Sequence, residues 1–120
     1  MRVPALVSSL ALTCASLSYA DIYQYEDCDN NGSLFLTNLD PIPNADLSNL
    51  YLGCADLAFS PLYSADLSGS DLSGANLYSG QLVGSNLTGA NISSADLSAA
   101  NLNSSTIDGA DLSDSNLLSA

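Results

Sequence analysis

The chain has 120 residues, enough for one domain of ordinary size together with a targeting segment. It contains 13 Asp and Glu residues against one Lys or Arg and no His, which gives a formal net charge of −12 at pH 7. This balance excludes nucleic acid as a partner, because nucleic-acid binding relies on Lys and Arg to neutralise phosphates. It also argues against an enzyme, because the serines have no His or Lys to serve as a general base.

Residues 1–20 have the pattern of a secretory signal peptide. Arg2 precedes an apolar run over residues 5–17, and small residues lead up to a cleavage position at Ala20. We therefore predict removal of this segment and a secreted or periplasmic protein. The apolar run is shorter than the ~20 residues that span a bilayer, so no membrane insertion is expected after cleavage. A buried N-terminal helix and a lipoprotein signal at Cys14 are the alternatives.

Residues 21–44 form an acidic segment with a partial calcium-binding pattern. Asp27, Asp29 and Asn31 alternate ahead of a glycine, as in the first half of an EF-hand loop, where oxygens at alternate positions bind Ca²⁺. The second half differs, because Asn38 stands where such a loop has a bidentate Glu. An acidic turn without metal is the other interpretation. We expect no cofactor, with calcium at these three residues as the alternative.

The remaining residues, 45–120, are a five-residue repeat. A small residue stands two positions before the aliphatic residue in fourteen of fifteen units, and Asp or Asn stands directly before it in eleven of fifteen. Each unit therefore reads small residue, Asp or Asn, Leu, and two further residues. The fifteen aliphatic positions, which we predict to form a core ladder, are Leu47, Leu52, Leu57, Leu62, Leu67, Leu72, Leu77, Leu82, Leu87, Ile92, Leu97, Leu102, Ile107, Leu112 and Leu117.

A period of five fits neither an α-helix nor a flat strand, because it would spread the leucines around the helix or alternate them between the faces of the strand. It fits a coil in which each unit forms one short side and four sides close a square. Coils of ~20 residues would pair at the strand spacing of ~4.8 Å, and the fifteen units would make just under four of them. We therefore predict an all-β fold, a quadrilateral β-helix. Glycine tolerates the tight turns that its corners require, and corner positions hold Gly69, Gly74, Gly84, Gly89 and Gly109.

Stretches such as Ala65–Gly69 (ADLSG) and Ala90–Ser94 (ANISS) resemble the pentapeptide-repeat family. The resemblance covers residues 45–119 and implies that the β-helix is right-handed. Leu50, Tyr51 and Pro61 depart from the repeat. We therefore expect irregularity in the first coil.

The open ends of such a stack need covering, because an end coil leaves unpaired backbone groups. Residues 21–44 are predicted to cap the N-terminal end. In an oxidising compartment Cys28 and Cys54 are predicted to form a disulfide that ties this cap to the array, two unpaired thiols being the alternative. The sequence offers no cover for the C-terminal coil. Either the chain is a fragment, or that coil supports end-to-end association.

Aromatic residues suggest a contact surface on the array. Tyr63 and Val83 occupy equivalent outward positions on successive coils, with Tyr51, Phe59 and Tyr78 elsewhere in the repeats. We predict surface binding at Tyr63, Tyr78 and Val83. Scattered exposed aromatic residues without a function are the alternative interpretation.

Three functions compete, and we favour an exported, non-enzymatic structural or protein-interaction module that presents an acidic solenoid to an unknown protein. The family resemblance implies the second, since some members resemble B-DNA in width and charge and bind DNA gyrase. Export and an array only roughly 18 Å long argue against that function. The third is a calcium-dependent surface protein that uses Asp27, Asp29 and Asn31.

Overall fold

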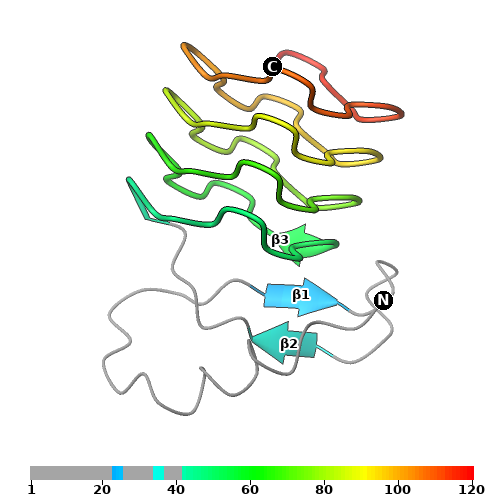
Figure 1. The fold of residues 1–120 in the computed structure, drawn as a ribbon. Coiled ribbons are helices and arrows are strands. Elements are labelled where there is room, and N and C mark those ends of the chain that lie inside the picture. The colour runs from blue at the N-terminus through cyan, green and yellow to red at the C-terminus, as the bar shows by residue number, and fades with distance from the viewer. Residues whose placement is uncertain (1–22, 26–33, 37–41) are drawn as a thin grey trace.

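The computed structural model describes residues 23–25, 34–36 and 42–120 of the chain. Its named strands are short: β1 is Tyr23–Tyr25, β2 is Leu34–Leu36 and β3 is Ala55–Asp56. They pair antiparallel in the order β2-β1-β3, with β3 on the first coil of the array (Figure 1). Within these ranges no helix has the length and apolarity that crossing a membrane requires. The predicted signal peptide, residues 1–20, lies outside them.

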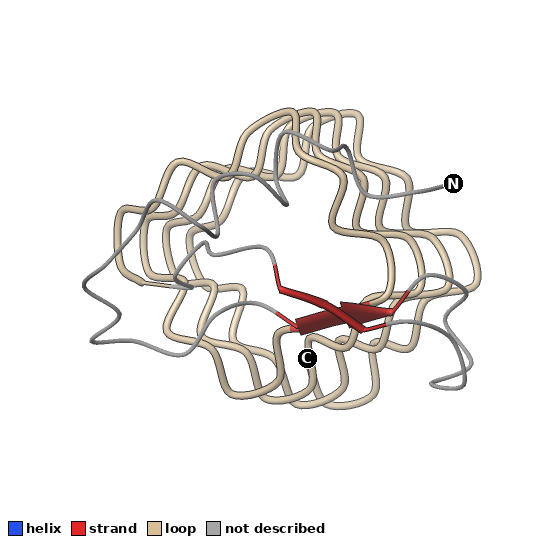
Figure 2. Ribbon diagram, turned by 90° about the horizontal axis from the view of Figure 1, so that it is seen from below, coloured by secondary structure: helices blue, strands red, loops and turns tan. Residues whose placement is uncertain are grey.

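From residue 42 onward the chain winds into stacked coils that lie in register over one another (Figures 1 and 2). Parallel bridges join residues twenty positions apart, as between Asp46 and Asp66. The N–H of Leu67 donates to the Asn86 carbonyl on the next coil at 2.8 Å, and the N–H of Asn86 donates back to the Ala65 carbonyl at 2.9 Å. This register is that of a four-sided coil built from five-residue units, as the sequence predicts.

The sides of the coil contain little regular strand. In the described part of the array only β3 is a named strand, and the remaining pairing consists of isolated bridges. Each unit of the array except that of Pro61 contributes a bridged residue before the chain turns again. The predicted all-β class is therefore right about backbone pairing between coils and overstates the amount of strand.

Every corner of the described array holds a residue with positive φ two positions after the aliphatic residue. The five predicted corner glycines have φ between 64 and 70°. Ser79, at 54°, adopts the same conformation without being glycine. Together with turn hydrogen bonds such as Ala75 N–H to Leu72 O at 3.0 Å, this is the geometry of a type II turn.

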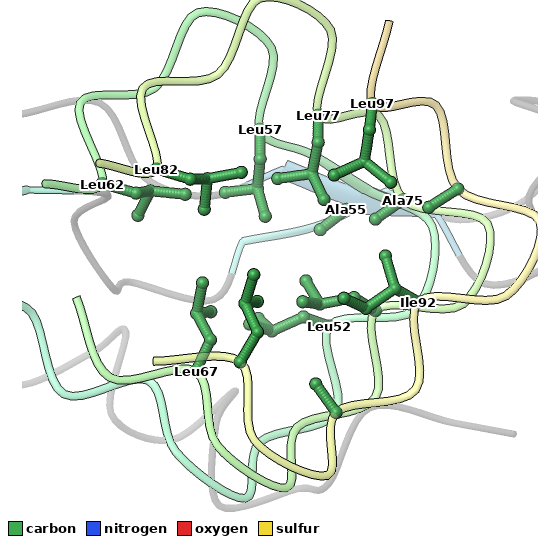
Figure 3. Close-up of a cluster of buried hydrophobic side chains, with 14 of the residues drawn as sticks. Leu52, Ala55, Leu57, Leu62, Leu67, Ala75, Leu77, Leu82, Ile92 and Leu97 are labelled. Carbon is green, nitrogen blue, oxygen red and sulfur yellow. The ribbon is translucent and has the colours of Figure 1, made fainter. Parts of the chain in front are cut away.

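The core is a set of aliphatic rows that point into the coil, with small residues such as Ala55 and Ala75 between them (Figure 3). The end coil differs from the predicted ladder. Leu102 and Leu112 are only partly buried, and Ile107 and Leu117 are 46% and 45% exposed, because no further coil of the described chain lies over them. The ladder residues that are fully buried are Leu47, Leu52, Leu57, Leu62, Leu67, Leu72, Leu77, Leu82, Leu87, Ile92 and Leu97.

The irregularity expected in the first coil occurs at Pro61. Leu62 N–H donates to the Ser60 carbonyl at 3.0 Å, whereas the aliphatic residues of neighbouring units donate to the next coil. Leu50 and Tyr51 fit the stack despite departing from the repeat. Leu50 packs against the core and its carbonyl accepts from the next coil, while Tyr51 forms a regular bridge.

The N-terminal edge of the array pairs with β1, in which Tyr23 lies opposite Asp56 of β3. Cys54, directly before β3, is disulfide-bonded. Cys28 lies outside the described residues, so its pairing with Cys54 stays a prediction, as do the predicted domain boundaries. The stack itself begins before residue 45, because Asn44 N–H already donates to the Tyr63 carbonyl at 2.8 Å.

Candidate functional site

Carboxylates are distributed unevenly around the coil. Residues 57–64, 77–84 and 97–104 stack as two corners and the side between them, and they contain no Asp, Glu, Lys, Arg or His. We call these three ranges the neutral side. The carboxylates of residues 42–120 all lie on the other three sides and their corners, which we call the acidic sides: Asp46, Asp56, Asp66, Asp71, Asp96, Asp108, Asp111 and Asp114.

Hydrogen bonds within a unit and between coils hold most of the carboxylates of the acidic sides. One oxygen of Asp66 accepts from the Ser68 N–H at 3.0 Å, from the Ser68 hydroxyl at 2.7 Å and from the Asn86 amide of the next coil at 3.2 Å. Asp96 has the same set of partners, Ser98 and Asn116. These Asx turns fix the side chains, so the acidic sides present charge in a set pattern.

The same hydrogen bonds lower the pKa values of several carboxyl groups. The hydroxyl of Ser68 is the largest cause at Asp66, and that of Ser98 at Asp96, followed in each case by the serine N–H. At Asp111 the N–H of the following serine comes first. Because a hydrogen bond donated to the ionised form favours it, these carboxylates stay charged at neutral pH.

The described residues include no group of three or more His, Cys, Asp or Glu side chains placed to hold a metal ion. The predicted calcium ligands Asp27, Asp29 and Asn31 lie outside the described ranges. Calcium binding there stays a prediction.

Aromatic side chains gather on the neutral side. The rings of Phe59 and Tyr78 meet edge to face, with centroids 5.3 Å apart and planes at 88°. On the adjoining corner the Tyr63 hydroxyl lies 3.5 Å from the Gln81 side-chain oxygen, and the Gln81 amide donates to the Ser79 carbonyl at 3.2 Å. Gln81 thus links the two corners of the neutral side.

The predicted surface residues all lie on the neutral side, but they differ in exposure. Tyr63 and Tyr78 are 41% and 42% exposed, and Val83 is partly buried. The most exposed aromatic residue of the described array is Phe59, at 68%, which was named among the aromatic residues of the repeats but not among the three predicted binding residues. The sequence could have indicated this residue, because a coil of twenty residues places position 59 beside positions 78 and 79.

Phe59 also stands at an unusual backbone position. Its φ is 59°, in the left-handed region that large side chains rarely adopt. Equivalent corner positions hold glycine or small polar residues at most other units, for example Ser64, Ser79 and Gly74. A large apolar side chain here lies mostly in solvent, so core packing does not explain it.

Comparison with known proteins identifies the repeat. A family described as "Pentapeptide repeats" matches residues 44–77 and 81–117, with eight copies. A pentapeptide repeat protein from the cyanobacterium Cyanothece 51142 is 31% identical, with a TM-score of 0.53 over 62% of this chain and 54% of that one. One from the Arabidopsis thaliana thylakoid lumen is 28% identical, with a TM-score of 0.51 over 64% of this chain and 53% of that one.

The chain therefore spans about half the length of each of these two solved structures. No curated protein sequence matches it significantly.

Proposed function

Because the chain belongs to the pentapeptide-repeat family, whose members are generally non-enzymatic interaction modules, we propose that it is an exported structural or protein-interaction module. Its solenoid presents acidic side chains to a protein partner. The observation that supports this most is the set of hydrogen bonds around Asp66 and Asp96, which hold surface carboxylates in a fixed array. Fixed side chains lose little conformational entropy when a partner binds.

Several finer features belong to the same proposal. We propose that the coil is right-handed, as in the fold of the family. Its fifteen units make just under four turns. We propose that residues 1–20 direct export from the cytoplasm and that Cys28 and Cys54 form a disulfide, which is stable in an oxidising compartment. Exposure of the ladder residues Ile107 and Leu117 on the end coil supports end-to-end association through that coil.

Site-specific photo-crosslinking tests the proposal. A photoreactive phenylalanine analogue replaces one exposed residue at each corner in turn: Tyr78, Thr88, Asn103 and Ser113. We expect a discrete protein adduct from at least one corner, recovered from the secreted or periplasmic fraction. An exported protein that gives no adduct from any of the four corners would contradict the function.

The acidic array also supports a second function, a DNA mimic that binds gyrase. Against it stands the neutral side, because duplex DNA carries phosphate charge all around its circumference. We expect the purified protein to leave gyrase supercoiling unaffected. Inhibition that is lost in an Asp46→Asn, Asp66→Asn, Asp96→Asn variant would replace the interaction-module proposal with the mimic.

Calcium-dependent surface binding is the third function. It rests on Asp27, Asp29 and Asn31 alone, and isothermal titration with CaCl₂ separates it from the other two. Heat that disappears in Asp27→Asn with Asp29→Asn would support the calcium site.

A further inference from the structure

The neutral side and its borders together form a surface with an apolar centre and charged edges. Its aromatic residues are the Phe59–Tyr78 ring pair at one corner and Tyr63 at the other, with Gln81 between the two corners. One edge is the ladder in which Asp56 and Asp96 directly precede the Phe59 corner and its stacked equivalents. The other edge lies just beyond the Tyr63 corner, in the ladder that contains Asp46 and Asp66.

This arrangement has the anatomy of a protein-interaction patch, in which an aromatic centre is surrounded by a polar rim. The rim carries only negative charge, so a complementary partner carries Lys or Arg around its apolar contact. Guanidinium and ammonium groups also bind favourably over Tyr and Phe rings.

The size of the patch limits the partner further. The neutral side extends over three stacked coils, which at a strand spacing of ~4.8 Å places its outer rows roughly 10 Å apart. A standard interface buries about 800 Å² on each partner, which calls for a broader surface. A strip this narrow suits one extended or helical segment of a partner.

A second copy of the chain is a poor occupant. Residues 42–120 contain no Lys, Arg or His, so another array offers no positive charge to the acidic edges. Two arrays brought together at this face would set the carboxylates of both rims close to one another, which costs free energy.

We propose that the neutral side binds a basic peptide segment of another protein, with an aromatic or large aliphatic residue packed on Phe59 and Tyr78 and flanking Lys or Arg residues at the acidic edges. This inference rests on the proposed function as an interaction module. It adds the face that is used and the chemistry of the partner.

A random peptide library displayed on phage provides the probe, selected at low salt against the full chain. We expect enriched peptides to carry Lys or Arg on both sides of an aromatic or large aliphatic residue. Synthetic versions should bind the double variant Phe59→Ser, Tyr78→Ser about tenfold more weakly, as loss of a central aromatic contact predicts. Serine already occupies equivalent corner positions, as at Ser79 and Ser98, so this variant should keep its fold.

The charged edges have a matched control in the ladder that lies on the opposite side of the coil from the neutral side. Asp56→Asn with Asp96→Asn should weaken binding several-fold and reduce its salt dependence. Asp71→Asn with Asp111→Asn removes the same charge from the ladder opposite the neutral side, ten residues along the coil from Gln81 and Asn101, and should change binding little.

The outcomes separate the two proposals. Selected peptides that lose binding in the Asp71, Asp111 variant and keep it in the Phe59, Tyr78 variant would overturn the neutral side as the binding face, with the interaction function intact. Selected peptides that bind the neutral side but lack basic residues would overturn the proposed partner chemistry. Failure to enrich any peptide would count against both proposals.

Discussion

Leu97 and Leu117 occupy the same position of the repeat on successive coils, yet Leu97 is fully buried and Leu117 is 45% exposed. Both follow a polar ladder residue, Asp96 or Asn116, and these two residues form a bridge. Their burial differs because the coil that contains Leu117 covers Leu97, whereas no described coil covers Leu117. The repeat therefore determines where a side chain points, and the neighbouring coil determines how much it is buried.

This dependence on neighbours is typical of solenoids, whose stability is approximately a sum over units and the contacts between adjacent units. The backbone follows the same rule. The N–H of Leu97 donates to the Asn116 carbonyl at 2.8 Å, and that of Ala99 donates to the Leu118 carbonyl at 2.8 Å. The end coil thus contributes to the stability of the coil below it.

The largest expected effect tests this difference directly. Leu97→Ala should lower the free energy of unfolding by about 3 kcal/mol, because it leaves a cavity inside a closed core. Leu117→Ala should lower it by about 1 kcal/mol, since nearly half of that side chain is already in solvent. Urea unfolding followed by tyrosine fluorescence measures both, as the chain has six Tyr and no Trp.

A matched surface variant, Asn103→Ala, tests whether the assay responds to the interior, because this side chain is exposed and should change stability little when it is removed. Equal losses of unfolding free energy in Leu97→Ala and Leu117→Ala would show that the end coil is covered in solution. The predicted difference between the two coils would then not exist.

Much of the architecture of the array could be predicted from the sequence, and some of its features could not. The five-residue period predicts the inward ladder and the register of twenty residues, because only a four-sided coil keeps Leu and small residues pointing inward together. The corner glycines predict the tight turns, although Ser79 and Phe59 show that glycine is not required there. The neutral side was also present in the sequence, as three uncharged ranges spaced twenty residues apart.

The geometry of individual side chains could not be predicted from the repeat. The edge-to-face contact of Phe59 with Tyr78 depends on rotamers that the repeat does not determine. Likewise Ser70 and Ser85 occupy equivalent, fully buried positions, but only Ser70 has a hydrogen bond for its hydroxyl, to the Leu67 carbonyl at 2.7 Å.

Serines at the small-residue position of the repeat give a second comparison between successive coils, with smaller expected effects on stability. Ser85 is 1% exposed and its hydroxyl has no hydrogen-bond partner, whereas Ser105, twenty residues later on the end coil, is partly buried and donates to the Leu102 carbonyl at 2.7 Å. Ser85→Ala should raise the free energy of unfolding by about 1 kcal/mol, because it removes a buried polar group without a partner. Ser105→Ala should lower it by about 0.5 kcal/mol.

Thermal unfolding of the two serine variants beside the unmodified chain measures these changes. A loss of stability in Ser85→Ala would mean that its hydroxyl does find a partner, and that the two coils satisfy their serines alike.

The smallest expected effect concerns carboxyl groups, whose hydrogen bonds lie mostly within one unit and so depend less on the neighbouring coil. The pKa of Asp96 is lowered first by the Ser98 hydroxyl, while that of Asp111, on the end coil, is lowered first by the Ser113 N–H. Ser98→Ala removes the leading cause and should raise the pKa of Asp96. Ser113→Ala keeps the N–H and should raise the pKa of Asp111 by less. Carboxyl ¹³C NMR titration measures both groups.

The sign of the linked stability change follows from the lowered pKa of Asp96. A carboxyl whose pKa is lower in the folded chain stabilises the fold above its unfolded pKa, and this contribution is lost as the pH falls below about 4 and through the folded value. Ser98→Ala should therefore reduce the part of the acid destabilisation that depends on Asp96, and Ser113→Ala should change acid stability less. A larger pKa rise at Asp111 than at Asp96 would show that the coil above, and not the unit itself, controls these carboxylates.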